Sequence, residues 1–210
     1  MLSPDTSMTQ QPTIFVVDDD ARVRDSLRWL LESVSLQVET FGSATDFLHA
    51  CDPHRRGCLI LDVRMPDISG LQLQDILAER GFRLPIIMLS GHGDVRTAVR
   101  VVQKGAVDFI EKPYNGQELL DRIHSVLATD ARRHREESAN MAICKRIGSL
   151  TPREREVLDW VVSGTSNKRI AAELGISIKT VEVHRARVME KMAAKSVAEL
   201  TAMRIICGLH

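Results

Sequence analysis

The sequence has no long apolar run. None approaches the roughly 20 residues that a membrane-spanning helix needs, although 44% of all residues are hydrophobic. The opening stretch, MLSPDTSMTQQP, also lacks the basic and then apolar pattern of a secretion signal. These absences predict a cytoplasmic protein without a membrane partner, in which residues 1–12 form a disordered lead.

Cysteine is scarce, and its spacing is uninformative. The four cysteines are scattered, and no two of them form the C-x-x-C spacing of a zinc or redox motif. The sequence therefore indicates neither a zinc site nor a disulfide framework, and a reducing cytoplasm is the expected environment. Cys58 begins an apolar segment, so we interpret it as a small buried hydrophobic residue. The other three are Cys51, Cys144 and Cys207.

Net charge is absent overall but not locally, since the chain has 28 basic and 28 acidic residues. Residues 1–128 contain 13 Lys and Arg against 18 Asp and Glu, whereas residues 129–210 contain 15 against 10. An acidic half joined to a basic half is typical of a regulatory or ion-binding module attached to a module that binds a polyanion. A length of 210 residues accommodates two modest domains.

The first half alternates short apolar segments with helical patterns. Continuous apolar segments are typical of strands buried on both faces of a sheet, and five strands alternating with five helices imply right-handed crossovers. The sequence thus predicts an α/β, doubly wound, five-stranded parallel sheet over residues 13–128. The expected strands are 13–17, 36–40, 58–62, 84–90 and 106–112.

The second half is helical. Residues 129–147 are charged and nearly free of strand formers, so we interpret them as a linker, partly helical. Thr151, Pro152 and Glu154 then form a capping signal that opens an all-α domain at 148–210. Its second and third helices flank a glycine turn, as in a helix-turn-helix. The four helices are expected at about 152–163, 167–174, 178–192 and 196–207.

Acidic, basic and hydroxyl side chains follow the predicted strands of the first half. Asp18 and Asp19 end the first strand, Asp62 the third, Ser90 the fourth and Lys112 the fifth. The carboxyl ends of parallel strands share one crevice, so these groups converge. Clustered carboxylates favour a hard divalent cation such as Mg2+, and a carboxylate nucleophile beside a lysine can form an aspartyl-phosphate. Asp62 is the candidate acceptor.

These segments resemble the receiver domain of two-component response regulators. The resemblance rests on VVDDDARVR, LILDVRMPDISGLQL, IIMLSGHGD and GAVDFIEKP, and covers roughly 13–128. It implies Asp62 as phosphoacceptor, a cis peptide before Pro113, and Mg2+, with Mn2+ as a substitute. Asp20 is interpreted as a helix cap and His92 as a loop residue. The implied metal ligands are Asp18, Asp19, Asp62 and the backbone carbonyl of Arg64, and the implied switch residues are Ser90, Phe109 and Lys112.

The second half resembles the LuxR-type DNA-binding domain over about 148–204. With the receiver in front, the chain is similar to response regulators of the NarL/FixJ class, and most similar to its FixJ branch. On the third helix, Ile178, Val181, Val188 and Met192 form the expected apolar stripe. The opposite face is expected to meet the DNA major groove, where cations reach phosphates and shorter side chains reach bases. Its residues are Lys179, Thr180, Glu182, Val183, Arg185, Ala186 and Arg187.

The resemblance implies a phosphorylation-controlled transcription regulator, not an enzyme with a separate substrate. The resemblance further implies that a sensor histidine kinase phosphorylates Asp62, and that the protein is then expected to dimerise, bind DNA and act on RNA polymerase, as an activator. The fourth helix supplies a dimer seam, core packing or both. Three alternatives stay open: a phosphatase or phosphotransferase, a LuxR-type sensor of a small molecule, and a phosphorylation-independent regulator with a relic receiver.

Overall fold

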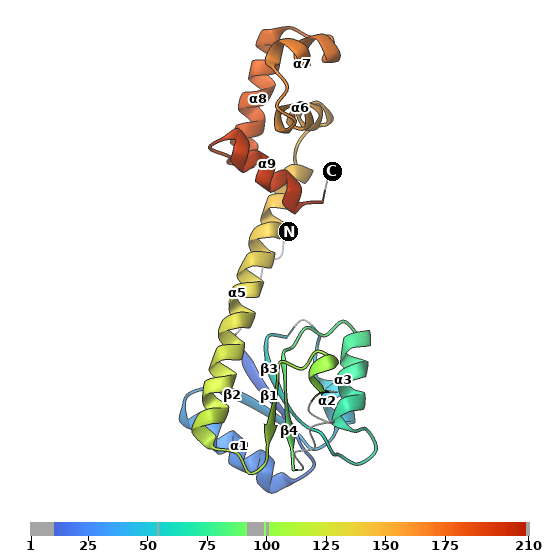
Figure 1. Cartoon of the computed structure of the whole chain (residues 1–210), viewed down its shortest axis with the longest axis vertical. Helices are drawn as coiled ribbons and strands as arrows, with labels where there is room; N and C mark the ends of the chain where they lie inside the picture. The colour runs from blue at the N-terminus through green and yellow to red at the C-terminus, as the bar shows by residue number, and fades with distance from the viewer. Residues whose placement is uncertain (1–10, 54, 92–98, 100, 209–210) are drawn as a thin grey trace, which may run out of the picture. The chain divides into compact units, whose positions relative to one another are not determined.

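The computed structural model describes residues 11–53, 55–91, 99 and 101–208 (Figure 1). The chain divides into two compact units, 1–131 and 132–210, which are described separately below. His92, interpreted above as a loop residue, lies outside the described residues, as does most of the expected lead at 1–12. No helix in the described ranges is long and apolar enough to cross a membrane.

The first unit is built on a five-stranded parallel sheet. The strands lie in the order β2-β1-β3-β4-β5, which confirms the predicted doubly wound fold. Their registers pair Val17 with Leu61 and Ser90 with Glu111, so neighbouring strands end at one edge. The strands are β1 (Thr13–Val17), β2 (Gln37–Phe41), β3 (Gly57–Asp62), β4 (Ile86–Ser90) and β5 (Asp108–Glu111).

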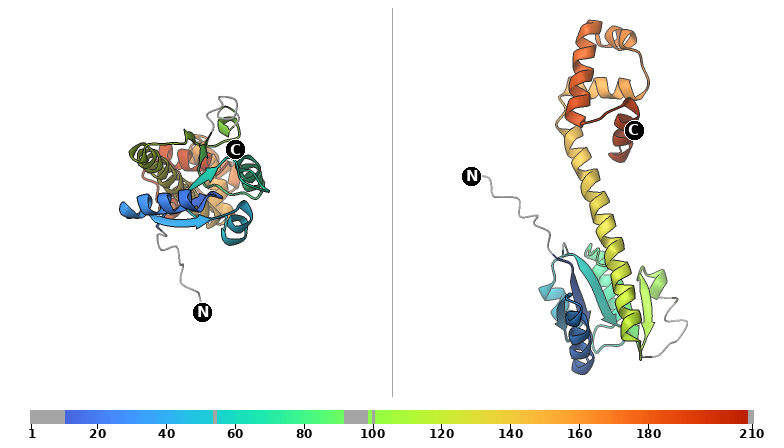
Figure 2. Two further views of the ribbon diagram at one scale, coloured as in Figure 1. Left: turned by 90° about the horizontal axis from the view of Figure 1, so that it is seen from below. Right: turned by 90° about the vertical axis from the view of Figure 1, so that its left-hand side faces the viewer.

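Helices cover both faces of this sheet (Figures 1 and 2). Helices α1 (Ala21–Ser33) and α5 (Gly116–Gly148) pack on the face that includes Ile14 and Ile60. Helices α2 (Ala44–Ala50) and α3 (Gly70–Glu79) pack on the opposite face. The central strands are therefore buried on both faces, which explains their unbroken apolar sequences.

Side-chain caps fix where the helices of the first unit begin. The side chain of Asp20 accepts a hydrogen bond from the backbone N–H of Arg22, and the hydroxyl of Ser43 accepts one from that of Asp46. Each cap satisfies a backbone donor that the first helical turn leaves without a partner. The interpretation of Asp20 as a helix cap is confirmed.

Helix α5 is longer than the sequence predicts. It runs for 33 residues through the whole segment interpreted as a partly helical linker. Within the second unit, Ile143 and Ile147 of this helix pack against the core of the helical domain. The apolar contacts of these two residues stabilise the helix in a segment that is otherwise polar.

Among the described residues, the second unit contains four further helices packed around one core. Val157 and Leu158, Ile170, Val181 and Leu200 are all fully buried there. The predicted bounds of the second and third helices are confirmed, but Ile178 is 46% exposed and does not belong to the buried stripe. The helices are α6 (Pro152–Val162), α7 (Asn167–Leu174), α8 (Ile178–Met192) and α9 (Val197–Ile206).

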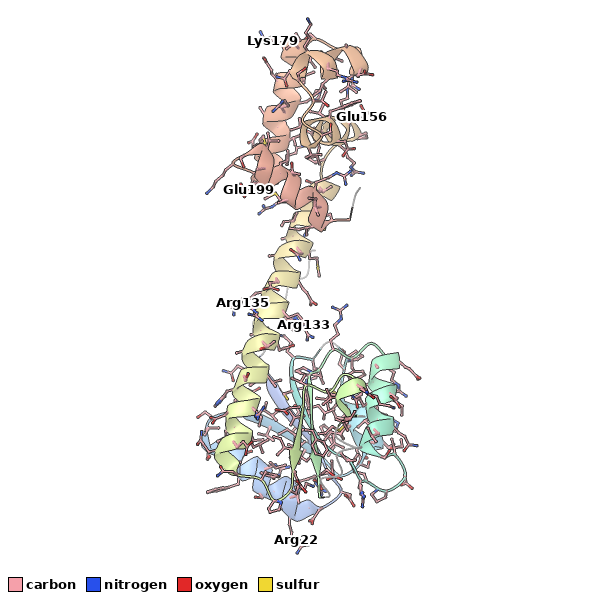
Figure 3. All side chains as sticks on the ribbon, viewed as in Figure 1. Arg22, Arg133, Arg135, Glu156, Lys179 and Glu199 are labelled. Carbon is pink, nitrogen blue, oxygen red and sulfur yellow. A yellow bond between two sulfur atoms is a disulfide. The ribbon has the colours of Figure 1, made fainter. Side chains whose placement is uncertain are left out.

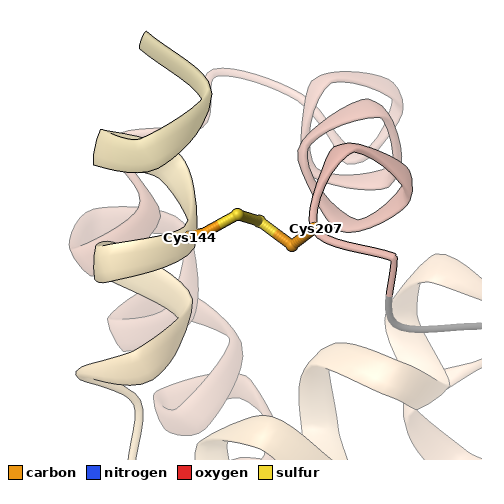
Figure 4. The surroundings of a disulfide bond; sticks show 2 residues. All are labelled: Cys144 and Cys207. Carbon is orange, nitrogen blue, oxygen red and sulfur yellow. A yellow bond between two sulfur atoms is a disulfide. The ribbon is translucent and has the colours of Figure 1, made fainter. Parts of the chain in front are cut away.

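A disulfide joins Cys144 of α5 to Cys207, the residue that caps the C-terminal end of α9 (Figure 4). The expectation of no disulfide is therefore wrong. The two cysteines are 63 residues apart, and only the packing of α9 beside the end of α5 brings their Cα atoms to 5.5 Å. Cys58 is fully buried with a free thiol, as predicted.

A buried carboxylate fixes the start of α6. The side chain of Glu154 accepts hydrogen bonds from the backbone N–H of Thr151 at 2.9 Å and from Lys191 Nζ of α8 at 2.6 Å. These bonds, led by the one from Lys191, lower the pKa of Glu154 from 4.5 to about 2. Because the folded pKa lies below the unfolded one, this stabilisation is fully present above pH 4.5 and is lost as the pH falls toward 2.

Glu154→Gln should therefore lower the free energy of unfolding of the second unit by about 1–2 kcal/mol at pH 7, because glutamine keeps the cap but loses the charge-assisted bond. It should also flatten the pH dependence of stability between pH 4.5 and 2, as followed by urea unfolding with circular dichroism. Glu156→Gln is the control, since Glu156 pairs with Arg153 at an exposed position and should cost about 0.5 kcal/mol or less. Equal losses for the two variants would contradict this assignment.

Candidate functional site

Two aspartates lie side by side at the carboxyl edge of the sheet. Asp62 ends β3, and Asp18 follows the last residue of β1, whose Val17 is paired with Leu61. Both carboxylates are buried, with side-chain exposures of 3% for Asp18 and 9% for Asp62. Two negative charges buried in the same site are unfavourable without a compensating positive charge.

Lys112, which follows β5, provides that charge. Its Nζ donates to Asp18 Oδ2 at 2.7 Å and to Asp62 Oδ1 at 2.6 Å. The peptide bond between Lys112 and Pro113 is cis, as expected. One ammonium group thus bridges two carboxylates that are 44 positions apart in the chain.

The electrostatics of the three groups are coupled. Burial raises the pKa of Asp62, and the hydrogen bond from Lys112 opposes that shift only in part. Burial also disfavours the charge on Lys112, but hydrogen bonds to Asp18 and Asp62 hold the pKa of Lys112 above its ordinary value. The site therefore keeps a protonated lysine in contact with a carboxylate that is poorly solvated, which is a suitable state for a nucleophile.

The backbone after Asp62 folds closely around its carboxylate. The N–H of Arg64 donates to Asp62 Oδ2 at 2.7 Å, and the N–H of Gly70 donates to the carbonyl of Val63 at 3.0 Å. A Cβ atom at Gly70 would lie only 2.2 Å from the carbonyl oxygen of Asp62. Glycine at this position thus lets α3 begin directly against Asp62.

The remaining predicted residues of the first unit lie around this centre. Ser90 is buried at the end of β4, and its carbonyl accepts a hydrogen bond from the N–H of Lys112 at 2.7 Å. Phe109 on β5 is partly buried against the core formed with α2 and α3. Asp19 is exposed beside Asp18.

Arg24 is a structural partner that the sequence reasoning missed. Its Nη1 donates to the carbonyls of Asp18 at 2.7 Å and Asp19 at 3.0 Å, and so fixes the loop between β1 and α1. An arginine in the second turn of a helix that follows an acidic loop was the available signal. Arg24 binds main-chain oxygens, which leaves the carboxylates to Lys112.

The oxygen atoms of the loop suit a hard cation. The described residues contain no ready cluster of three or more Asp, Glu, His or Cys side chains that could hold a metal ion. Lys112 contacts one oxygen of each buried carboxylate. Asp18, Asp19 and Asp62 nevertheless carry three formal negative charges, and Lys112 carries one positive charge. The site therefore has an excess of formal negative charge. Mg2+ is commonly bound by a few protein carboxylates, and water or phosphate oxygens complete its ligand shell. The carboxylates of this site fit that pattern.

The exposed face of α8 is the candidate nucleic-acid interface. Figure 3 shows Lys179 on the outside of the unit at the beginning of this helix. Among the predicted DNA-contact residues, Arg185 has a structural contact: its Nη1 donates to Asn167 Oδ1 of α7 at 2.7 Å, and this bond joins α8 to α7. Of the predicted contact residues, Thr180 and Arg185 are half-buried, and the exposed ones are Lys179, Glu182, Val183, Ala186 and Arg187.

Both units match known families. Residues 14–124 match the response regulator receiver domain, and residues 148–204 match the luxR family of bacterial regulatory proteins. The transcriptional regulatory protein TdiR of Thauera aromatica is 51% identical over 188 residues, covering 90% of this chain and 83% of TdiR. FixJ of Azorhizobium caulinodans is 46% identical over 202 residues, covering 96% of each chain.

Solved structures agree with these relatives. The response regulator StyR superimposes with a TM-score of 0.85 at 42% identity, covering 92% of this chain and 98% of that one. Full-length FixJ from B. japonicum gives a TM-score of 0.59 at 40% identity, covering 96% and 100% of the two chains. The similarity therefore includes both units.

Gly70→Ala should destabilise the first unit by about 1–3 kcal/mol, because a Cβ cannot lie 2.2 Å from the Asp62 carbonyl without displacing α3 or the loop. Urea unfolding monitored on the first unit measures this loss. The matched control is Gly148→Ala, where a Cβ meets nothing within 4 Å. A Gly70→Ala protein as stable as the control would show that the close approach imposes no constraint.

Proposed function

The chain belongs to the DNA-binding response regulators of two-component systems, and on that premise we propose that a sensor histidine kinase phosphorylates it on Asp62. The observation that carries the proposal is the bridge from Lys112 to Asp18 and Asp62. It combines a poorly solvated carboxylate nucleophile with a cation that can bind phosphoryl oxygens. The family relationship supplies the partner class.

In the proposed reaction, an oxygen of Asp62 attacks the phosphorus atom of a phosphohistidine, and the imidazole leaves. Asp18, Asp19, Asp62 and the backbone carbonyl of Arg64 would hold Mg2+ or Mn2+, which neutralises phosphoryl charge when bound. Lys112 is placed to contact a phosphoryl oxygen, and the N–H of Arg64 already donates to Asp62 Oδ2. The chain accepts the group and has no separate substrate, so we do not propose an enzyme.

Phosphorylation would change the charge balance of this centre. A phosphoryl group adds roughly −1.5 to −2 charges, which draws Lys112 away from Asp18 and attracts the hydroxyl of Ser90. Movement of these strand ends would reposition Phe109 and the segment at about 94–112. Three valines in the described part of that segment, Val99, Val102 and Val107, are 50–55% exposed. Their apolar surface suits a dimer contact formed on activation.

A phosphorylated dimer would present two copies of α8 to DNA. Two recognition helices related by a two-fold axis fit half-sites about one helical turn apart. Each would use cations on phosphates and shorter side chains on base edges. In α9, Leu200 and Met203 are core residues, whereas Val197 and Ile206 are exposed and available for a dimer seam. We propose transcriptional activation through contact with RNA polymerase, in the cytoplasm.

Asp62→Asn should abolish the covalent phosphoryl adduct that the wild type forms with Mg2+ and acetyl phosphate, because the amide is not a nucleophile. Intact-protein mass spectrometry and size-exclusion chromatography measure the adduct and the dimer. The control is Asp67→Asn, which changes an exposed aspartate of the same loop and should form the adduct normally. A wild type that forms no adduct, yet binds DNA as well as any variant, would instead support a regulator with a relic receiver.

Arg187→Ala and Lys179→Ala should each weaken binding to a duplex selected by the protein from random DNA, and should reduce the salt slope of the affinity by about 1. Both side chains are exposed on α8 and can reach phosphates. Fluorescence anisotropy at several salt concentrations measures the slope. Lys195→Ala, an exposed cation outside α8, is the control and should leave the slope unchanged. Equal slopes for all three variants would place the DNA elsewhere.

A further inference from the structure

The disulfide connects the C-terminal end of α5 to the C-terminal end of α9. Cys144 lies one turn before the end of α5, the helix that leads into the second unit, and Cys207 caps α9. Figure 4 shows the bond as the direct link between them. The adjacent residues Ile205 and Ile206 at the end of α9 are 61% and 44% exposed. The bond therefore fixes the part of α9 that carries exposed apolar surface.

A permanent disulfide is not expected in this class of protein. A DNA-binding regulator works in the compartment that holds DNA, where thiols are kept reduced, and disulfides there are usually transient. We propose that Cys144 and Cys207 form a reversible thiol–disulfide modification site, in which oxidation fastens the end of α9 to α5. The proposal requires only the DNA-binding half and does not depend on chemistry at Asp62.

The four cysteines differ in their access to an oxidant. Cys144 is exposed and Cys207 is half-buried. Cys51 and Cys58 are buried, and burial raises the pKa of the Cys51 thiol to about 11 and that of Cys58 further. Since the thiolate is the reactive form, we expect exchange at Cys144 and Cys207 and not at the two buried thiols.

Oxidation by a small disulfide such as glutathione disulfide balances in two steps. The Cys144 thiolate attacks one sulfur of the oxidant, forming a mixed disulfide and releasing one glutathione thiolate. The Cys207 thiolate then attacks the Cys144 sulfur and releases the second. The protein loses two electrons and two protons, and one glutathione disulfide becomes two glutathione molecules. A dithiol reverses both steps.

Reduction should loosen α9 without unfolding the second unit. Leu200 and Met203 lie in the core, and Arg204 pairs with Asp159 of α6 at 2.8 Å, and none of these contacts involves the two sulfur atoms. The disulfide closes a loop of about 60 residues and so reduces the conformational entropy of the unfolded chain. Reduction removes this stabilising effect. The reduced form should therefore melt several degrees lower than the oxidised form, and amides at the end of α9 should exchange faster.

The full-length protein tests the site directly. It is equilibrated in glutathione buffers from strongly reducing to strongly oxidising, its free thiols are trapped with a maleimide, and the labelled cysteines are located by mass spectrometry. We expect Cys144 and Cys207 to gain and lose label together and reversibly, while Cys51 and Cys58 stay unlabelled. The melting temperature of the second unit should follow the same transition.

Matched variants separate a switch from a structural bond. Cys144→Ser and Cys207→Ser should each melt like the reduced wild type in every buffer, whereas Cys51→Ala should keep the full redox response. A bond that persists at a reducing, cytoplasm-like glutathione ratio, or one that fails to form with excess glutathione disulfide, would overturn the proposal. So would equal melting temperatures of the oxidised and reduced wild type.

Discussion

The receiver half depends on one ammonium group that neutralises two buried carboxylates. Lys112, which follows β5, donates through its Nζ to Asp18 at the end of β1 and to Asp62 at the end of β3. Removing one member of such a set leaves a buried charge without compensation, which costs far more than an exposed ion pair contributes. The same set can respond to a new charge, because a lysine shared between two carboxylates must redistribute when one of them is modified.

In the DNA-binding half, cationic side chains of α8 make polar contacts with two other helices. Glu154 joins the start of α6 to Lys191 of α8, and Asn167 at the start of α7 accepts from Arg185 of α8. Both contacts fix α8 from its inner side. The orientation of α8 is therefore determined by polar contacts with two other helices.

The fold could be predicted from the sequence because each element carries its own signal. Apolar strands, caps such as Ser43 and Thr151, and glycine at Gly175 are local features, and the structure confirms them. Contacts between distant elements could not be predicted from such features. The disulfide between Cys144 and Cys207, the exposure of Ile178 and the length of α5 all depend on how the helices pack.

The most direct test of the account is a crystal structure of the full chain with Mg2+ and beryllofluoride, a phosphoryl mimic. We expect the beryllofluoride group on Asp62, with Lys112 Nζ bound to one of its fluorine atoms and the contact of Lys112 with Asp18 lost. A beryllofluoride group bound to any other residue would contradict the assignment of Asp62. A group on Asp62 with Lys112 still bridging the two carboxylates would contradict the central role given to the lysine.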